Sequence, residues 1–106
     1  MDECLFCKIV NKETPKALEK ETEDIIVFKD ISPRAPIHLL LVPRKHYRDI
    51  TEADGAIWSK IREIALQIAA EKNLKGFRLV HNAGDAAAVG HMHVHFLGEV
   101  AVDREV

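Results

Sequence analysis

Three histidines alternate with apolar residues close to the end of the chain, where His91–Leu97 reads His-Met-His-Val-His-Phe-Leu. Because successive side chains of a β-strand point to opposite faces, a strand here places the three imidazole rings on one face and Met92, Val94 and Phe96 on the other. The apolar face predicts a strand that packs on a core. The opposite face carries rings that exchange protons near neutral pH, so we expect the chemistry of the protein there.

The spacing of these histidines limits what they can bind together. Neighbouring rings on one strand face are about 6.6 Å apart at Cα, and the outer two, His91 and His95, are about 13 Å apart. Two adjacent rings can share a metal ion with bonds of about 2.0 Å, whereas all three converge on one ion only with difficulty. The residues alone leave three alternatives open: catalysis, metal binding with a ligand from elsewhere, or a solvated polar face. In the catalytic alternative an imidazole attacks phosphorus directly, and the flanked central ring of His93 is the natural attacking group.

The rest of the chain supplies a core for such a strand. Hydrophobic residues make up 47% of the 106 residues and charged residues 30%, a balance typical of a folded domain. A long helix is expected over 51–72, capped by Thr51, with an apolar stripe at Ile57, Ile61, Ile64, Ala65 and Ile68. A short helix is expected over 4–12, and strands over 17–20, 24–28, 37–42 and 76–82. The pattern predicts one domain over 1–106 with an α+β fold, in which a mainly antiparallel five-stranded sheet accompanies one long helix and a short N-terminal helix.

The charge and hydropathy of the chain argue against several classes of partner. With a formal net charge of −2 at pH 7 and a pI near 6.3, the chain lacks the basic footprint of a nucleic-acid-binding protein. No apolar run approaches the roughly 20 residues that a membrane-spanning helix needs. The start of the chain, Met1–Glu3, is acidic and has no apolar signal core, so we expect a cytoplasmic protein.

The only two cysteines, Cys4 and Cys7, form a Cys-x-x-Cys pair near the N-terminus. In a reducing compartment such a pair is typical of half a metal site or of a redox motif. A redox motif is expected after a strand, at the start of a helix in a βαβ unit, and no predicted strand precedes this pair. Metal binding is therefore favoured over redox chemistry, and redox chemistry over inert thiols.

The histidine segment also carries a resemblance to a known family. His91–Leu97 matches the signature His-φ-His-φ-His-φ-φ, with φ apolar, of the histidine-triad family. The chain resembles the Hint branch, whose members are nucleoside phosphoramidase-like, over nearly its whole length. Further matches are Cys4–Val10, Phe28–Pro33, Ala35–His38, Val42–His46, Asn82–Gly84 and Leu97–Gly98.

The resemblance implies a role for each matching residue. His93 is expected to attack the substrate and carry the nucleoside monophosphate as a nucleotidyl-imidazole. His95 and Asn82 are expected to contact the α-phosphate, and His38 to complete the catalytic histidines. Asp30 is expected to accept hydrogen bonds from both ribose hydroxyls, which suits a carboxylate because its oxygens only accept hydrogen bonds. The expected base pocket consists of Phe6, Ile9, Phe28, Ile31 and Leu40.

Each of these residues also has a structural alternative. The less favoured alternative is a hydrogen-bonded position in a buried strand for His38, and the cap of the turn before Ser32 and Pro33 for Asp30. The five apolar residues would equally suit a plain core.

Relatives that keep the Cys-x-x-Cys pair imply a structural zinc site in this chain. The matching ligands are Cys4, Cys7, His46 and His91, and we expect one zinc ion per chain. Two thiolates and two imidazoles form a closed tetrahedral set with no position for a catalytic water. His91 is then structural while His93 and His95 face the phosphate, and no catalytic metal is expected.

One departure from the family concerns the loop before the triad. Many Hint-like relatives carry a hydroxyl residue where Ala88 stands, and the loop here is shorter. An alanine side chain cannot help a leaving group to accept a proton, and the loss of such help costs about 10²-fold or more. Amine leaving groups would suffer most.

The resemblance therefore implies a hydrolase or transferase that acts at the α-phosphorus of a purine nucleotide conjugate such as an adenosine phosphoramidate. Two alternatives stay open: a dinucleoside polyphosphate hydrolase like those of the Fhit branch, and a zinc-stabilised nucleotide-binding module with weak activity. The family usually forms homodimers, and Ile57 and Trp58 are candidates for that contact.

Overall fold

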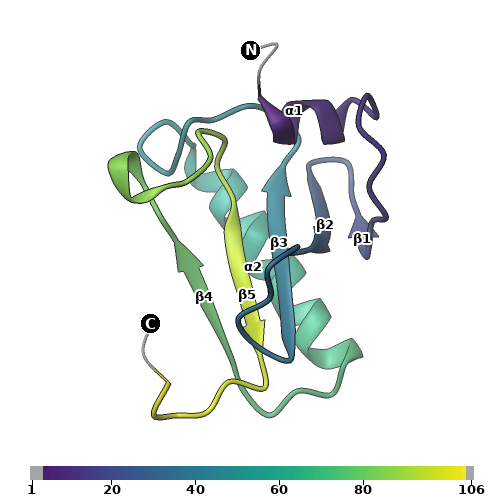
Figure 1. The fold of residues 1–106 in the computed structure, drawn as a ribbon, viewed down its shortest axis with the longest axis vertical. Coiled ribbons are helices and arrows are strands. Elements are labelled where there is room, and N and C mark those ends of the chain that lie inside the picture. Colours follow the sequence, from purple (N-terminus) through teal and green to yellow (C-terminus); the bar gives the residue numbers. More distant parts are fainter. Residues whose placement is uncertain (1–3, 105–106) are drawn as a thin grey trace.

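The computed structural model describes residues 4–104. The acidic start Met1–Glu3, on which the expectation about a signal segment rests, lies outside the described residues. In chain order the elements are α1 (Leu5–Val10), β1 (Lys20–Glu21), β2 (Ile25–Lys29), β3 (Ile37–Pro43), α2 (Gly55–Glu71), β4 (Phe77–His81), the 3-10 helix η1 (Gly84–Ala86) and β5 (Val94–Gly98), as Figure 1 shows.

The five strands form one antiparallel sheet in the order β1-β2-β3-β5-β4. The predicted α+β class is confirmed, with an antiparallel sheet, one long helix and one short one. Strand β5 lies between β3 and β4, and its register places His95 opposite both Leu40 and Val80. The histidine strand therefore runs through the sheet with a hydrogen-bonded neighbour on each side.

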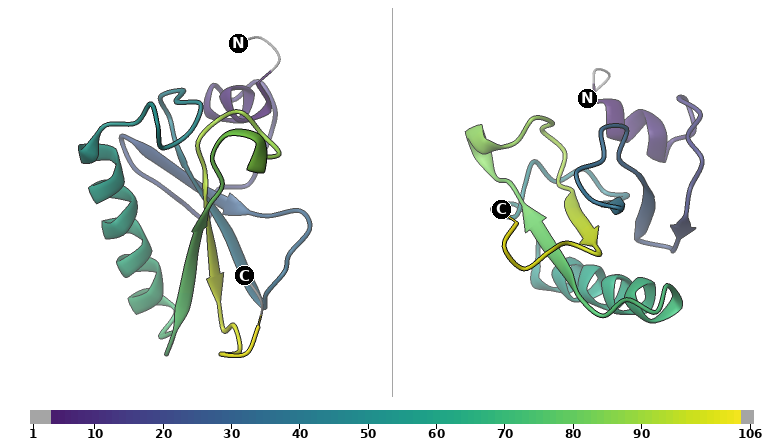
Figure 2. Two further views of the ribbon diagram at one scale, coloured as in Figure 1. Left: turned by 90° about the vertical axis from the view of Figure 1, so that its left-hand side faces the viewer. Right: turned by 60° about the horizontal axis from the view of Figure 1, so that its bottom comes forward.

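Helix α2 covers one face of this sheet (Figure 2). Its apolar stripe packs on the inward side chains of β3 and β5, among them Leu39, Leu41 and Phe96. The five residues of the predicted stripe are all buried: Ile57, Ile61, Ile64, Ala65 and Ile68. Of the two candidates for a contact with a second chain, Ile57 is buried in this core and Trp58 is 40% exposed.

The start of α2 differs from the prediction. The helix is capped by Asp54, whose side chain accepts a hydrogen bond from the Ile57 amide at 2.9 Å. Thr51 instead donates its hydroxyl hydrogen bond to Asp49 in the preceding turn. Asp and Thr are both common N-cap residues, so the helix could begin after Thr51 or after Asp54. The hydrogen bond to Asp49 engages the Thr51 side chain, which leaves Asp54 as the cap.

The opposite face of the sheet is only partly covered (Figure 2). There α1 lies over a second cluster in which Phe6 and Ile9 pack on Phe28 and Leu40. Strand β3 is buried on both faces, as its almost wholly apolar sequence predicts. Among residues 4–104, no helix has the length and hydropathy required to cross a membrane.

The histidine strand itself begins later than its pattern indicates. Ladder pairing starts at Val94, so His91 and His93 precede the regular strand although both are buried. The main chain there turns to another partner, because the Met92 amide donates to the Tyr47 carbonyl at 2.7 Å. The triad thus stands at the junction between β5 and the segment that follows β3.

Candidate active site and metal centre

The uncovered part of the sheet forms an open pocket of about 800 Å³. Pockets of this volume are the usual size for small-molecule ligands. The structure brings all ten residues of the predicted catalytic and substrate-binding set to this pocket: Phe6, Ile9, Phe28, Asp30, Ile31, His38, Leu40, Asn82, His93 and His95. Ile31 is 87% exposed and lies at the rim of the pocket, so it lines the pocket opening rather than its buried interior.

The ring of His93 is buried and has a fixed protonation pattern. Its Nδ1 lies 2.8 Å from the main-chain carbonyl of His91. Because a carbonyl only accepts, Nδ1 donates this bond and Nε2 is the nitrogen without a proton. Burial lowers the pKa of His93, which favours this neutral form, and Phe6 packs edge-on against the ring with centroids 5.1 Å apart. A neutral imidazole with a fixed lone pair suits nucleophilic attack.

A second pair of rings is fixed from the other end. The Arg34 amide donates to Nδ1 of His38 at 2.9 Å, so the proton of the neutral ring lies on Nε2. This Nε2 is 2.9 Å from Nδ1 of His95 and donates to it. His95 then carries its own proton on Nε2. This N–H group can donate a hydrogen bond to a phosphate oxygen.

The environment keeps these rings neutral. Burial, followed by the neighbouring rings of His93 and His38, lowers the pKa of His95 to about 4. Burial also lowers the pKa of His38, against the opposing effect of Asp30. The site therefore holds its histidines as uncharged donors and acceptors at neutral pH.

Asp30 combines the two uses that the sequence allows. Its Oδ1 accepts a hydrogen bond from the Ser32 amide at 2.8 Å, which caps the turn. Its Oδ2 lies at the pocket, 3.4 Å from Nε2 of His38. One oxygen is thus structural, and the carboxylate also lines the pocket in which a ribose is expected.

A second cluster lies beside the pocket, where Cys4, Cys7, His46 and His91 bring four ligand atoms within 4.8 Å of one another. Sγ of Cys7 is 3.2 Å from Nδ1 of His46 and 3.5 Å from Nδ1 of His91, and Sγ of Cys4 is 3.4 Å from the latter. Tetrahedral zinc bonds to sulfur and nitrogen would place such atoms about 3.5 Å apart. The spacing fits a metal ion bound by all four residues.

The protonation of His91 also fits a metal ion. Its Nε2 donates to the Pro43 carbonyl at 2.8 Å, which leaves the lone pair on Nδ1, directed at the two thiols. Burial and the neighbouring Cys4 raise the pKa of the Cys7 thiol to about 11, so a bound cation is needed to hold it as a thiolate.

Asp30, His38 and His95 also lie within metal-ligand distance of one another. Here the chemistry does not fit an ion, because the Arg34 amide occupies Nδ1 of His38 and places the proton on the very nitrogen that would have to bind. His38 and His95 belong instead to a chain of hydrogen bonds that starts at the Arg34 amide.

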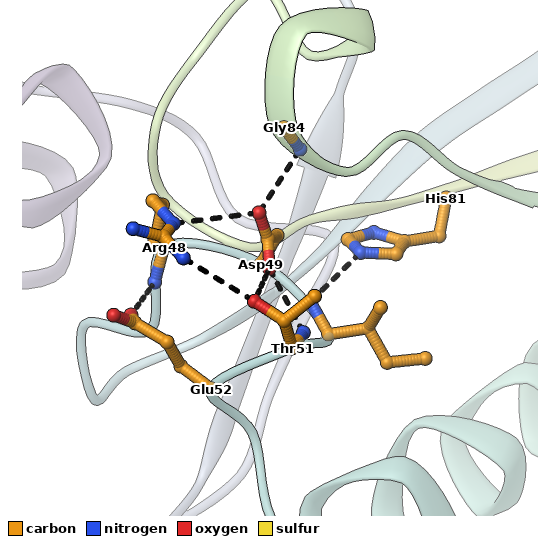
Figure 3. A network of polar contacts seen from close by, with 7 residues as sticks. Arg48, Asp49, Thr51, Glu52, His81 and Gly84 are labelled. Carbon is orange, nitrogen blue, oxygen red and sulfur yellow. Dashed lines mark hydrogen bonds and ion pairs between the residues drawn. The ribbon is translucent and has the colours of Figure 1, made fainter.

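Sequence reasoning missed a polar network at the turn before α2, which Figure 3 shows. Asp49 is 2% exposed; its Oδ2 accepts from the Gly84 amide at 3.0 Å and its Oδ1 from the Thr51 amide at 2.8 Å. The Thr51 hydroxyl, then the Gly84 and Thr51 amides, hold the pKa of Asp49 down at about 2. Asp49 thereby fixes the loop that follows Gly84 and includes Ala88 at the pocket. An Asp two residues before a Thr is the available sequence signal for such a turn.

Comparison with known proteins places the chain in a family. Residues 3–104 match the family described as scavenger mRNA decapping enzyme C-term binding. Protein HitA of Neisseria gonorrhoeae is 37% identical over 107 residues, which cover 92% of this chain and 97% of that protein.

Solved structures agree with this match. A histidine triad protein from Clostridium difficile superposes with a TM-score of 0.91 and 34% identity, covering 100% of this chain and 98% of the other. A HIT family hydrolase from Clostridium thermocellum gives a TM-score of 0.89 and 35% identity, with the same coverage of both chains. Together with the histidine row over the pocket, these matches define an α+β protein of the HIT fold. The chain belongs to the histidine-triad (HIT) family.

The lowered pKa of His95 gives a prediction about pH. In the unfolded chain this histidine titrates at its ordinary value of 6.5, and in the fold at about 4. The unfolded chain therefore binds more protons between these values, and acidification across this range lowers the free energy of unfolding. We expect the ring signals of His95, assigned by comparison with His95→Asn, to shift in NMR spectra only below about pH 5. A midpoint near pH 6.5 would contradict this.

Proposed function

We propose that this protein is a nucleotide hydrolase or transferase that acts at the α-phosphorus of purine nucleotide conjugates such as adenosine phosphoramidate. The observation that carries the proposal is the hydrogen bond from Nδ1 of His93 to the His91 carbonyl, which makes Nε2 the lone-pair nitrogen of a ring lining the pocket. His95, with its proton on Nε2, lines the same pocket. The structural relatives named HIT family hydrolases support a hydrolytic reaction.

The proposed reaction has two displacements. In the first, the Nε2 lone pair of His93 forms a bond to the α-phosphorus while the bond from phosphorus to the leaving group breaks, and the leaving group takes up a proton from solvent water. In the second, water attacks the nucleotidyl-imidazole and gives up a proton to solvent, the phosphorus–nitrogen bond breaks and the nucleoside monophosphate leaves. The Nε2 donor of His95 and the Asn82 side chain stabilise the charge on the phosphate oxygens in both steps.

A second candidate is dinucleoside polyphosphate hydrolysis, which the charges at the pocket favour. Among the described residues that line it, four are cationic (Lys16, Lys29, Arg34 and Arg104) and one is a carboxylate, Asp30. The Arg78 guanidinium donates to the Arg104 carbonyl at 2.6 Å and so holds the C-terminal turn beside the pocket. A polyphosphate leaving group suits cations and needs less help from a hydroxyl than an amine does, which fits Ala88.

The role of His93 is tested by replacing it with alanine. We expect His93→Ala to lower the rate of monophosphate release by at least about 10³-fold, while nucleoside monophosphate binding stays within about threefold. The assay compares adenosine phosphoramidate with a diadenosine polyphosphate and traps protein-bound nucleotide by acid quench. The faster substrate separates the two hydrolases. An unchanged rate in the variant would rule out His93 as the nucleophile, and binding without any trapped intermediate would favour the nucleotide-binding module.

We further propose that the Cys4, Cys7, His46 and His91 cluster binds one structural zinc ion per chain. With free zinc at about a thousand times its Kd, the ion adds about 4 kcal/mol to the free energy of unfolding. Chelation should therefore lower the thermal midpoint of the wild-type protein and leave that of Cys7→Ser unchanged. Metal analysis of protein purified without chelator provides the direct check, and zinc no higher than background would contradict the proposal.

We also propose that the protein is a homodimer. Strand β4 is an edge strand of the sheet, and Ile50, Trp58 and Leu79 expose apolar side chains. A second copy would cover both the strand edge and these side chains. Light scattering at micromolar concentration should give the mass of two chains, and a mass of one chain would overturn this assignment.

A further inference from the structure

His81 lies at the end of β4, outside the pocket. Its register partner is Val94, whose side chain belongs to the core under α2, so the His81 ring lies on the face of the sheet opposite to His95. There it meets the edge of Trp58, with ring centroids 6.3 Å apart. The predicted set of site residues did not include this histidine, and the proposed reaction does not use it.

Both nitrogens of the His81 ring bond to main-chain groups. The Ile50 amide donates to Nε2 at 3.0 Å (Figure 3). Because an amide N–H can only donate, Nε2 accepts, and the proton of the ring lies on Nδ1. This Nδ1 donates to the main-chain carbonyl of His93, also at 3.0 Å. One rigid ring thus joins the turn before α2 to the backbone of the proposed nucleophile.

The backbone of His93 needs such a bond because it precedes the regular strand. Ladder pairing of β5 begins only at Val94. The Met92 amide is held by the Tyr47 carbonyl, and the His93 ring by the His91 carbonyl. His81 supplies the contact to the His93 carbonyl from the neighbouring strand. The turn that it reaches, at Ile50, is the one in which Asp49 holds the Gly84 loop.

We propose that His81 is a positioning residue that fixes the backbone of His93 and thereby aims the His93 ring at the α-phosphorus. The inference rests on the proposed role of His93 as the nucleophile. A displacement of about 1 Å in a reacting group can cost about 10²-fold in rate. Loss of the hydrogen bond from His81 should therefore slow the formation of the nucleotidyl-imidazole while leaving substrate binding nearly intact.

The test compares two variants at position 81. His81→Val removes both hydrogen bonds and keeps a residue that favours strands. His81→Asn keeps a donor near the place of Nδ1 but cannot reach the Ile50 amide. We expect His81→Val to lower kcat for the faster substrate by about 10- to 100-fold with KM within about threefold, and His81→Asn to return kcat to within about threefold of wild type.

Ile68→Val serves as the matched control: it removes a methylene from the core near the other end of α2, and we expect it to leave kcat unchanged. A kcat of His81→Val within twofold of wild type would overturn the proposal. An equal loss in His81→Asn would do the same, because it would show a purely structural role.

A measurement without substrate separates this proposal from the proposed function. In ¹⁵N NMR spectra of the wild-type protein at neutral pH, we expect Nδ1 of His81 to be protonated and Nε2 to be unprotonated. The ring signals of His93 should shift in His81→Val and return in His81→Asn. The opposite tautomer, or unmoved His93 signals, would overturn the positioning role. If the tautomer and shifts are as expected but wild type traps no nucleotide on either substrate, the proposed function fails while the link from His81 to His93 stands.

Discussion

Each histidine of the triad region faces a group that decides which ring nitrogen carries the proton. The carbonyls of Pro43 and His91 place the proton of His91 and of His93 on the nitrogen that faces them, and leave a lone pair on the other. The Arg34 amide does the reverse for His38, and through it for His95. Four similar rings therefore suit different proposed roles, with His91 as metal ligand, His93 as nucleophile, His95 as donor to the phosphate and His38 as its support, because the groups that they face differ.

His91 connects the two centres of the molecule. Its ring belongs to the cluster with Cys4 and Cys7, whereas its carbonyl accepts the hydrogen bond from His93. The segment after β3 reaches the same place, because Pro43 and Tyr47 bond to residues 91 and 92. The cysteine–histidine cluster, the proposed nucleophile His93 and the segment after β3 thus meet at one irregular stretch of chain rather than on separate elements.

The residue pattern predicted the elements well where burial is regular, as in the one-sided apolar stripe of α2 and in the apolar run of β3, which is buried on both faces. The alternation of the triad correctly predicted that Met92, Val94 and Phe96 share the core face. The family resemblance named ten residues that the structure places around the pocket. The sequence did not predict the positions of Asp49 and His81, because each side chain bonds to a main-chain group of a residue distant in sequence. Asp49 bonds to Gly84 and His81 bonds to His93. A single sequence carries no periodic signal for such bonds. The start of α2 was misplaced for a related reason, since Thr51 is engaged by Asp49.

The short helix α1 links the cysteines to the pocket, although it has only six residues. Six residues are too few to form a stable helix alone, so its placement depends on what its side chains contact. Phe6 stands between the two cysteines in sequence and packs against the rings of both His93 and Phe28. A reagent or ion that alters the thiols is therefore expected to shift Phe6 and, with it, the apolar wall behind the His93 ring, in addition to the link that His91 provides.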